Sequence, residues 1–173
     1  YSSSKAIILY LVLFKILFHL IHPEYGYFRD ELFYIAVSDQ LSIFNLDLPL
    51  LTPFILKIFT SIFGYNIKSL HLASGLCGAL VIYVSCEMTR ILGGRQYAVF
   101  FTGILVFFSG LLPFGALYSY DSFNFLIETT AIFLLLKLII KKNPLLWIFF
   151  GITLGLGFLN KMSILLFGFS LFI

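Results

Sequence analysis

Long apolar runs follow one another along this chain and restrict its fold more than any other feature. About 20 apolar residues in a helix cross the hydrocarbon core of a bilayer, and by that measure the chain holds six spans, the last one incomplete. Only 11% of the 173 residues are charged, which excludes a water-soluble globule. The sequence therefore predicts an all-α, polytopic protein, a multi-pass integral protein of the cell membrane, with spans at about residues 5–22, 69–90, 96–113, 122–140, 144–160 and 162–173.

Both ends of the sequence indicate a segment of a longer protein. The chain begins with Tyr1 rather than Met and stops at Ile173, inside an apolar run without a cap. The last carbonyl groups of such a helix would be unsatisfied in hydrocarbon. We therefore expect residues 1–173 to be the N-terminal part of a multi-pass membrane domain, with further spans after it.

The segment 23–68, between the first two spans, differs from the rest because charged residues interrupt its apolar ones. We call it the outer loop. Helical spacing places Phe33 and Val37 on one face and Tyr34 and Ser38 on another. This pattern is typical of a helix that lies in the headgroup plane.

A second short helix is predicted further along the outer loop. Thr52 is expected to cap it, with Pro53 in the first helical position, and Gly64 is expected to end it. About eleven residues rise only ~16 Å and cannot cross ~30 Å of hydrocarbon. The outer loop is therefore predicted to be re-entrant or interfacial, with interfacial helices.

Basic residues orient the spans. Arg90 and Arg95 flank one short turn, and three lysines crowd the next one before Pro144, so the positive-inside rule predicts that both turns are cytoplasmic. Counting spans outward puts the outer loop and the connections near residues 113–121 and 160–161 on the opposite face. Three loops far apart in sequence thus open at one face. The formal net charge of +3 is too small to indicate nucleic acid as a partner.

Asp30 and Glu31, in the outer loop, are the strongest candidates for chemistry. Paired carboxylates commonly supply a general base together with a group that binds a metal or positions a hydroxyl. A structural explanation stays open as well. In that case Asp30 caps the interfacial helix, and Glu31 lies in its first turn, where the helix dipole favours a negative charge.

Asp121 and Lys161 are expected to open at the same face as the acidic pair. Asp121 is either the N-cap of a span or the third carboxylate of a base or divalent-cation site formed with Asp30 and Glu31. Lys161 either snorkels to the headgroups or binds an anionic phosphate. Arg29 is a second candidate for phosphate, because its planar fork suits phosphate oxygens. The sequence does not identify the cation.

Weaker signals predict packing or secondary roles. Glu128 lies about two turns inside its span and is expected to face protein or water. The motif Gly151-x-x-x-Gly155 and the small residues within 73–79 predict close helix contacts. A metal site near the end of the first span is possible on residue type but less favoured than an interfacial role for its members, which are His19, His22 and Glu24.

Three motifs, in this order, resemble one family. The sequence Gly-Tyr-Phe-Arg-Asp-Glu-Leu-Phe-Tyr-Ile-Ala at 26–36, followed by Asp47-x-Pro49-Leu50-x-x-Pro53, resembles the first outer loop of the polyprenyl-phosphate-dependent glycosyltransferases. This family is related to protein O-mannosyltransferases and bacterial aminoarabinose transferases. Residues 118–123 (YSYDSF) and 155–163 (GLGFLNKMS) are similar to two later landmarks of the same family. The resemblance covers essentially the whole chain.

The resemblance implies a membrane bundle of the C-type glycosyltransferase fold, of which this chain is the N-terminal part. It also implies transfer of a sugar from a polyprenyl-phosphate donor to a lipid, glycan or protein acceptor on the outer face, with inversion at the anomeric carbon. Asp30 matches the general base or acceptor-orienting acid, and Glu31 is its companion. Asp121 matches the second outer-face acid, and Lys161 matches a basic position near the lipid phosphate. Arg29 stands where a small or acidic residue is more usual, so its phosphate role is inferred from the residue alone.

Two other functional classes stay open. A multi-span transporter or flippase with an acidic outer vestibule would pair ionisable residues along a path through the bilayer. In this sequence those residues gather at one face, with Glu128 as the main exception. A structural assembly subunit would keep the fold without the activity, and only an intact site in the full-length protein argues against it.

Overall fold

The computed structural model of the chain describes residues 2–21, 26–41, 50–109 and 116–171. Within these ranges it contains eight α-helices and no β-strand, which confirms the predicted all-α fold. In chain order the helices are α1 (Ser2–Ile21), α2 (Arg29–Asp39), α3 (Leu51–Phe63), α4 (Ile67–Ile91), α5 (Gln96–Phe108), α7 (Tyr120–Lys141), α8 (Leu145–Asn160) and α9 (Ile164–Ser170).

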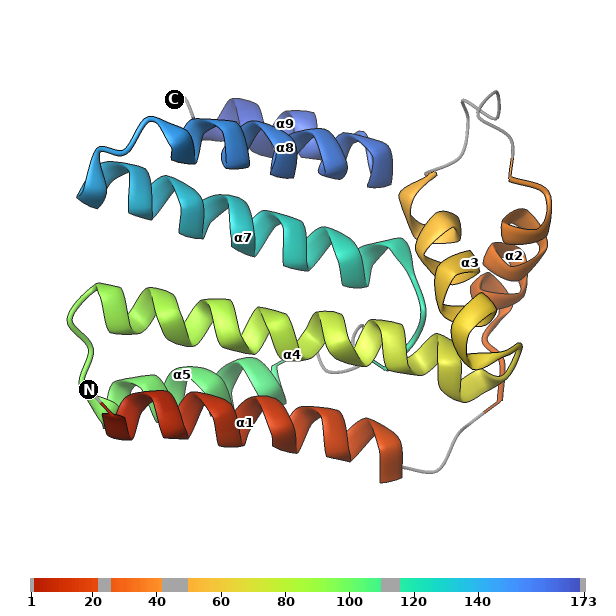
Figure 1. Cartoon of the computed structure of the whole chain (residues 1–173), viewed down its shortest axis with the longest axis horizontal. Helices are drawn as coiled ribbons and strands as arrows, with labels where there is room; N and C mark the ends of the chain where they lie inside the picture. Colours follow the sequence, from red (N-terminus) through yellow and green to blue (C-terminus); the bar gives the residue numbers. More distant parts are fainter. Residues whose placement is uncertain (1, 22–25, 42–49, 110–115, 172–173) are drawn as a thin grey trace.

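Most of the helices run along one common axis, while α2 and α3 stand across one end of the bundle (Figure 1). Helix α4 lies at the centre and packs against α1, α5 and α7. We call the end with α2 and α3 the outer end, after the predicted topology, and the end with the α4/α5 and α7/α8 turns the inner end. The arrangement of α2 and α3 is that expected of helices in a membrane interface above vertical spans.

Within the described ranges, three helices are long and apolar enough to cross a membrane: Ser3–Ile21, Ile67–Ile91 and Tyr120–Lys141. They agree to within a few residues with the spans predicted at 5–22, 69–90 and 122–140, so the chain folds as a polytopic membrane protein. Helices α5, α8 and α9 lie where the other three spans were predicted, but they are shorter. The 13 residues of α5 rise about 20 Å, and the end of its predicted span, residues 110–113, lies outside the described residues.

Small side chains in α4 allow the neighbouring helices to approach, as predicted. Ala73, Ser74 and Cys77 are buried, and a Cβ atom on Gly75 would lie 3.0 Å from Cδ2 of His19 in α1. Nothing among the described residues lies within 4 Å of a Cβ atom built at Gly151 or Gly155. The close helix contact predicted at these two glycines is therefore not made by the described part of the chain.

The second helix of the outer loop ends as predicted but begins differently. Gly64 follows the last residue of α3 with a φ of 80°, a left-handed conformation that glycine adopts without a Cβ penalty. The helix begins at Leu51, so Thr52 lies inside it and is not its N-cap. Thr52 is fully buried, and its hydroxyl donates a hydrogen bond to Asn160 of α8.

Helix α2 packs its polar face inward. Its buried residues are Glu31, Tyr34 and Ser38, whereas Phe33 is 48% exposed. The apolar and polar faces were separated correctly by helical spacing. The polar face contacts the end of the bundle, because its side chains find hydrogen-bond partners there.

Candidate active site

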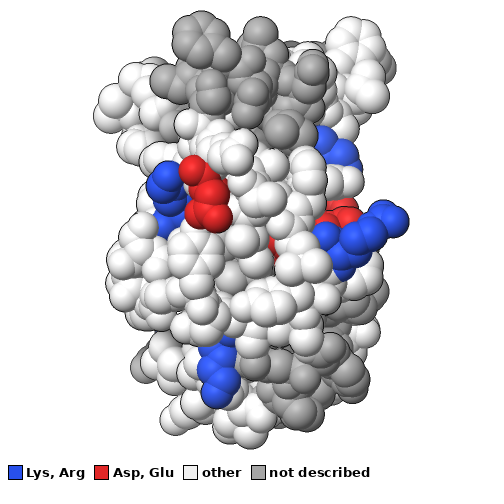
Figure 2. Space-filling view, turned by 90° about the vertical axis from the view of Figure 1, so that its right-hand side faces the viewer, with Lys and Arg blue, Asp and Glu red and all other residues white. Residues whose placement is uncertain are grey.

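Three segments far apart in sequence meet at the outer end of the bundle. They are the first turn of α2, the residues that lead into α7, and the turn after α8 (Figure 1). Together they hold all five residues singled out from the sequence, which are Arg29, Asp30, Glu31, Asp121 and Lys161. Seen from this end, acidic side chains lie beside basic ones in two places, and further basic side chains lie apart from them (Figure 2).

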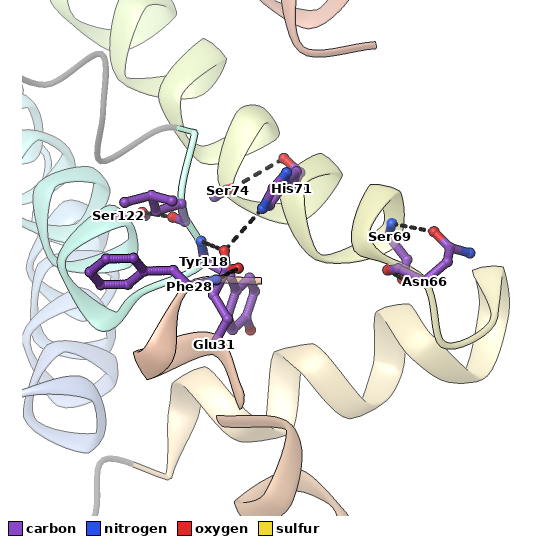
Figure 3. Close-up of polar contacts among 9 residues, drawn as sticks. Phe28, Glu31, Asn66, Ser69, His71, Ser74, Tyr118 and Ser122 are labelled. Carbon is purple, nitrogen blue, oxygen red and sulfur yellow. Dashed lines mark hydrogen bonds and ion pairs between the residues drawn. The ribbon is translucent and has the colours of Figure 1, made fainter. Parts of the chain in front are cut away.

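Glu31 is fully buried and joins three parts of the chain (Figure 3). Its Oε1 atom accepts hydrogen bonds from the backbone N–H of Tyr118 at 2.7 Å and pairs with Nε2 of His71 at 3.0 Å. Its Oε2 atom accepts from the backbone N–H of Phe28 at 2.9 Å. The capping explanation is therefore correct in part, since one oxygen satisfies the start of α2, but the other ties α2 to α4 and to the segment before α7.

The hydrogen bonds decide the charge of Glu31. Burial alone would raise the pKa of its carboxyl group, but the contacts with His71 and with the Tyr118 and Phe28 amides outweigh burial and hold the pKa below its ordinary value of 4.5. Glu31 is therefore an ionised, fully satisfied anchor. It offers no free oxygen to a substrate.

Asp30 has the opposite environment, although it is the next residue along the chain. Its side chain is 49% exposed, and its contact is with the Nε atom of Arg29 at 3.5 Å. Phe28, not Asp30, is the N-cap of α2, so capping does not account for Asp30. Its carboxylate faces the outside of the outer end and is open to a ligand.

Asp121 and Lys161 form an ion pair between α7 and the end of α8. The Nζ atom of Lys161 donates to Oδ1 of Asp121 at 3.0 Å and lies 4.5 Å from the centroid of the Tyr120 ring. The side chain of Asp121 is 29% exposed and that of Lys161 is 39% exposed. Ser119, not Asp121, is the N-cap of α7, so the capping explanation fails here as well.

The buried ring of Tyr34 joins α2 to the residues around the start of α7. Its ring meets the rings of Tyr118 and Tyr120 edge to face, with centroids 6.0 and 6.3 Å apart. Burial raises the pKa of Tyr34 well above its ordinary value, and the negative charges of Asp30 and Asp121 raise it further. The Tyr34 ring thus joins α2 to the start of α7, where Lys161 lies over the ring of Tyr120.

A chain of hydrogen bonds next to this site joins α3, α8 and the start of α7. The hydroxyl of Tyr118 donates to the carbonyl of Thr52 at 2.6 Å, and the hydroxyl of Thr52 donates to Oδ1 of Asn160 at 2.7 Å. The Nδ2 atom of Asn160 donates to the carbonyl of Tyr120 at 2.8 Å. These contacts hold Asp121 and Lys161, the neighbours of Tyr120 and Asn160, in position.

Sequence reasoning did not assign roles to Tyr118, Asn160 or His71, and it assigned Thr52 only as a helix cap. A usable signal existed for the first two, because each lies one to three residues from a predicted site residue and is polar at the edge of a span. No local signal existed for Thr52 and His71, whose partners lie 108 and 40 residues away.

Within the described residues the three acids do not gather as one group of cation ligands, so the predicted divalent cation stays a prediction. The carboxylate of Glu31 is occupied by His71 and two amides, and the described residues contain no group of three or more His, Cys, Asp or Glu that could hold a metal ion. Two carboxylates, Asp30 and Asp121, remain available in this part of the structure.

The weaker candidates have other surroundings. His19 packs against Gly75 in α4, while His22 and Glu24 lie outside the described residues, as do Asp47 and Pro49 of the outer-loop motif. The carboxylate of Glu128 has a partner on its own helix: its Oε1 atom accepts a hydrogen bond from Nδ2 of Asn124 at 2.7 Å.

A comparison with family models finds one match. The model described as dolichyl-phosphate-mannose-protein mannosyltransferase matches residues 47–173. This range includes the motifs at 118–123 and 155–163 and excludes the one at 26–36. No curated protein and no solved structure matches the chain.

Proposed function

The chain belongs to the dolichyl-phosphate-mannose-protein mannosyltransferase family, and on that premise we propose that its outer end is the reaction site of a membrane glycosyltransferase. The proposed reaction moves a sugar from a polyprenyl-phosphate donor to an acceptor on the outer face of the membrane, which is periplasmic, extracellular or luminal. One observation carries the proposal. Asp30, a half-exposed carboxylate, and the partly exposed ion pair of Asp121 with Lys161 come from three segments that meet where the Tyr34 ring contacts the Tyr120 ring and Lys161 lies over Tyr120.

Asp30 is proposed as the general base. An acceptor hydroxyl must lose a proton as it attacks the anomeric carbon, and a positioned carboxylate accepts that proton. Asp30 suits this role better than Glu31, because Asp30 is half exposed and Glu31 is fully buried with both oxygens engaged. Glu31 is proposed as a positioning residue that fixes the first turn of α2 and with it the direction of Asp30.

Lys161 is proposed as the partner of the donor phosphate. When the bond between the anomeric carbon and the phosphate oxygen breaks, negative charge grows on the phosphate, and a nearby cation stabilises it. Lys161 is only partly exposed and is held in place by Asp121 and by the ring of Tyr120. The side chain of Arg29 is 93% exposed, and we propose it as a second contact of the donor phosphate.

The proposed chemistry is a single displacement. The acceptor oxygen forms a bond to the anomeric carbon, the bond from that carbon to the phosphate oxygen breaks, and the acceptor proton passes to Asp30. The electron pair of the broken bond stays on the polyprenyl phosphate, next to Lys161. Attack from the face opposite the leaving group inverts the anomeric carbon, and acceptors with a hydroxyl on a lipid, glycan or protein fit the same step.

For a divalent cation, we propose two carboxylate ligands rather than three. Cations such as Mg²⁺ are commonly held by one or two carboxylates together with substrate phosphates, and Asp30 and Asp121 supply two. The displacement above uses no metal. Transfer in the presence of excess EDTA tests the requirement, and we expect less than a twofold loss; complete loss that Mg²⁺ restores would assign the cation to these two carboxylates.

The proposal is tested by replacing Asp30 in the intact protein. Transfer of radiolabelled sugar from a synthetic polyprenyl-phosphate donor pool to membrane acceptors is measured for wild type, Asp30→Asn and Asp39→Asn at equal expression. Asp39 is the matched control, because it is an exposed carboxylate of the same helix whose partner is the hydroxyl of Tyr65.

We expect Asp30→Asn to lower the transfer rate by at least about a hundredfold, the usual contribution of a general base, and Asp39→Asn to leave it unchanged. An unchanged rate in Asp30→Asn would remove Asp30 from the reaction. Absence of transfer from every donor with the wild-type protein would instead favour the transporter or structural role.

A further inference from the structure

The inner end of the bundle contains a cavity that the proposed reaction does not use. A cavity of about 510 Å³ lies between the start of α1 and the α4/α5 turn, and its lining includes Ser3, Arg90, Arg95, Gln96 and Tyr97. The Ser3 hydroxyl donates to Oε1 of Gln96 at 2.9 Å, which joins α1 to α5 beside the cavity. Figure 1 places both helix starts at the end opposite α2 and α3.

The cavity is suited to a negative charge. Arg95 is exposed and makes no ion pair within the described residues, whereas Arg90 is held by Glu87 at 2.6 Å. Arg95 is also the N-cap of α5 and provides no side-chain cap, so the first amide groups of α5, in the part of the helix that lines the cavity, have no intrahelical acceptors. Gly94 keeps the turn compact, because a Cβ atom there would lie 2.8 Å from the carbonyl oxygen of Thr89.

An apolar groove follows the same two helices into the membrane. A hollow of about 580 Å³ is lined from α1 by Ile7, Leu11 and Phe14 among others, and from α5 by Phe100 and Ile104. The steps from Ser3 to Ile7, Leu11 and Phe14, and from Gln96 to Phe100 and Ile104, are four, four, three, four and four residues. This spacing keeps all of these residues on one face of each helix, so the groove continues the seam that begins at the cavity.

We propose that this seam binds one anionic phospholipid of the inner leaflet, with its phosphate in the cavity beside Arg95 and an acyl chain in the groove between α1 and α5. A free phosphate would use the cavity alone, and an apolar helix from a partner would use the groove alone. A phospholipid uses both, since its charge and its chain are joined at the depth where the cavity meets the groove. The predicted cytoplasmic location of this end agrees with the anionic lipids of that leaflet.

The experiment measures lipid retention by the intact protein. The protein is purified in mild detergent, equilibrated with equal amounts of phosphatidylglycerol and phosphatidylcholine, and analysed by native mass spectrometry. Arg95→Gln removes the charge in the cavity, and Lys141→Gln is its control, since Lys141 is exposed at the same end but lies in α7. Leu13→Trp narrows the groove that Leu13 lines, and Leu105→Trp is its control on an exposed face of α5.

We expect the wild type and both controls to retain one phosphatidylglycerol in preference to phosphatidylcholine by about fivefold, the factor that one basic residue contributes at an anionic surface. Arg95→Gln is expected to abolish the preference, and Leu13→Trp to lower retention of both lipids. Equal retention of the two lipids by the wild type would overturn the proposal. A preference for phosphatidylglycerol that persists in Arg95→Gln would also overturn it. The proposal would equally fail if inorganic phosphate competed with the lipid while Leu13→Trp left lipid retention unchanged.

Discussion

Polar side chains make buried contacts between residues far apart in the sequence at the outer end, and mostly shorter-range contacts at the inner end. At the outer end Thr52 bonds to Asn160 across 108 residues, and Glu31 bonds to Tyr118 across 87. At the inner end Arg90 pairs with Glu87 three residues away, and Asn143 accepts from the amide of Leu145 two residues away; the exposed contact of Ser3 with Gln96 is an exception. The outer end therefore has the fixed geometry that a reaction site needs, and the inner end does not.

The largest expected effect is the loss of the carboxylate at the centre of the outer end. Glu31→Ala leaves the buried amides of Tyr118 and Phe28 without an acceptor and His71 without its partner, so we expect a loss of about 3 kcal/mol in the free energy of unfolding. Asn143→Ala at the inner end removes one exposed cap and should cost about 1 kcal/mol or less. Unfolding of the intact protein in mixed micelles, followed by circular dichroism, measures both. Equal losses would remove the contrast between the two ends.

The second effect concerns the contact between α3 and α8. Thr52→Val keeps the shape of the side chain but leaves Oδ1 of Asn160 unsatisfied, so we expect a loss of about 1–2 kcal/mol. Thr153→Val is the matched control, because that hydroxyl is exposed and bonds to Phe149 of its own helix. The same unfolding assay applies, and a Thr52→Val protein as stable as the control would show that this hydrogen bond does not join the helices energetically.

The third effect separates the basic residues of the two ends by function. Lys161→Met should raise the KM for the polyprenyl-phosphate donor about tenfold, the value of one charged hydrogen bond of ~1.4 kcal/mol. Lys141→Met removes a lysine at the inner end and should leave that KM unchanged. Steady-state transfer at varied donor concentration measures both variants. If both raised the KM equally, the effect would be one of general charge and not of the site.

The sequence was sufficient to predict which segments meet. Apolar length and the positive-inside rule placed the outer loop, Asp121 and Lys161 at one face, because both depend on the order of residues along the chain and on the lipid alone. Helical spacing, which is a local property, also separated the polar and apolar faces of α2.

The sequence was not sufficient to predict which of two adjacent carboxylates turns inward. Asp30 and Glu31 have similar chemistry, and the rotation of α2 that buries Glu31 depends on His71 and Tyr118, 40 and 87 residues away. Thr52 was misassigned as a cap for the same reason, since its partner Asn160 lies on another helix. The prediction of a three-acid cation site could not take account of the contacts by which Glu31 joins helices.

The smallest effect near neutrality is a pH dependence that only the outer end should show. The pKa of Glu31 lies below its ordinary value of 4.5 in the folded protein, so the folded state binds the proton less tightly than the unfolded state. The stabilisation from ionised Glu31 is therefore complete above pH 4.5 and is lost as the pH falls through the folded pKa. In wild type minus Glu31→Gln, the difference in free energy of unfolding should be constant at higher pH and shrink below this value. A difference that stays constant down to the lowest pH at which the protein unfolds reversibly would mean that the contacts of Glu31 do not depend on its charge.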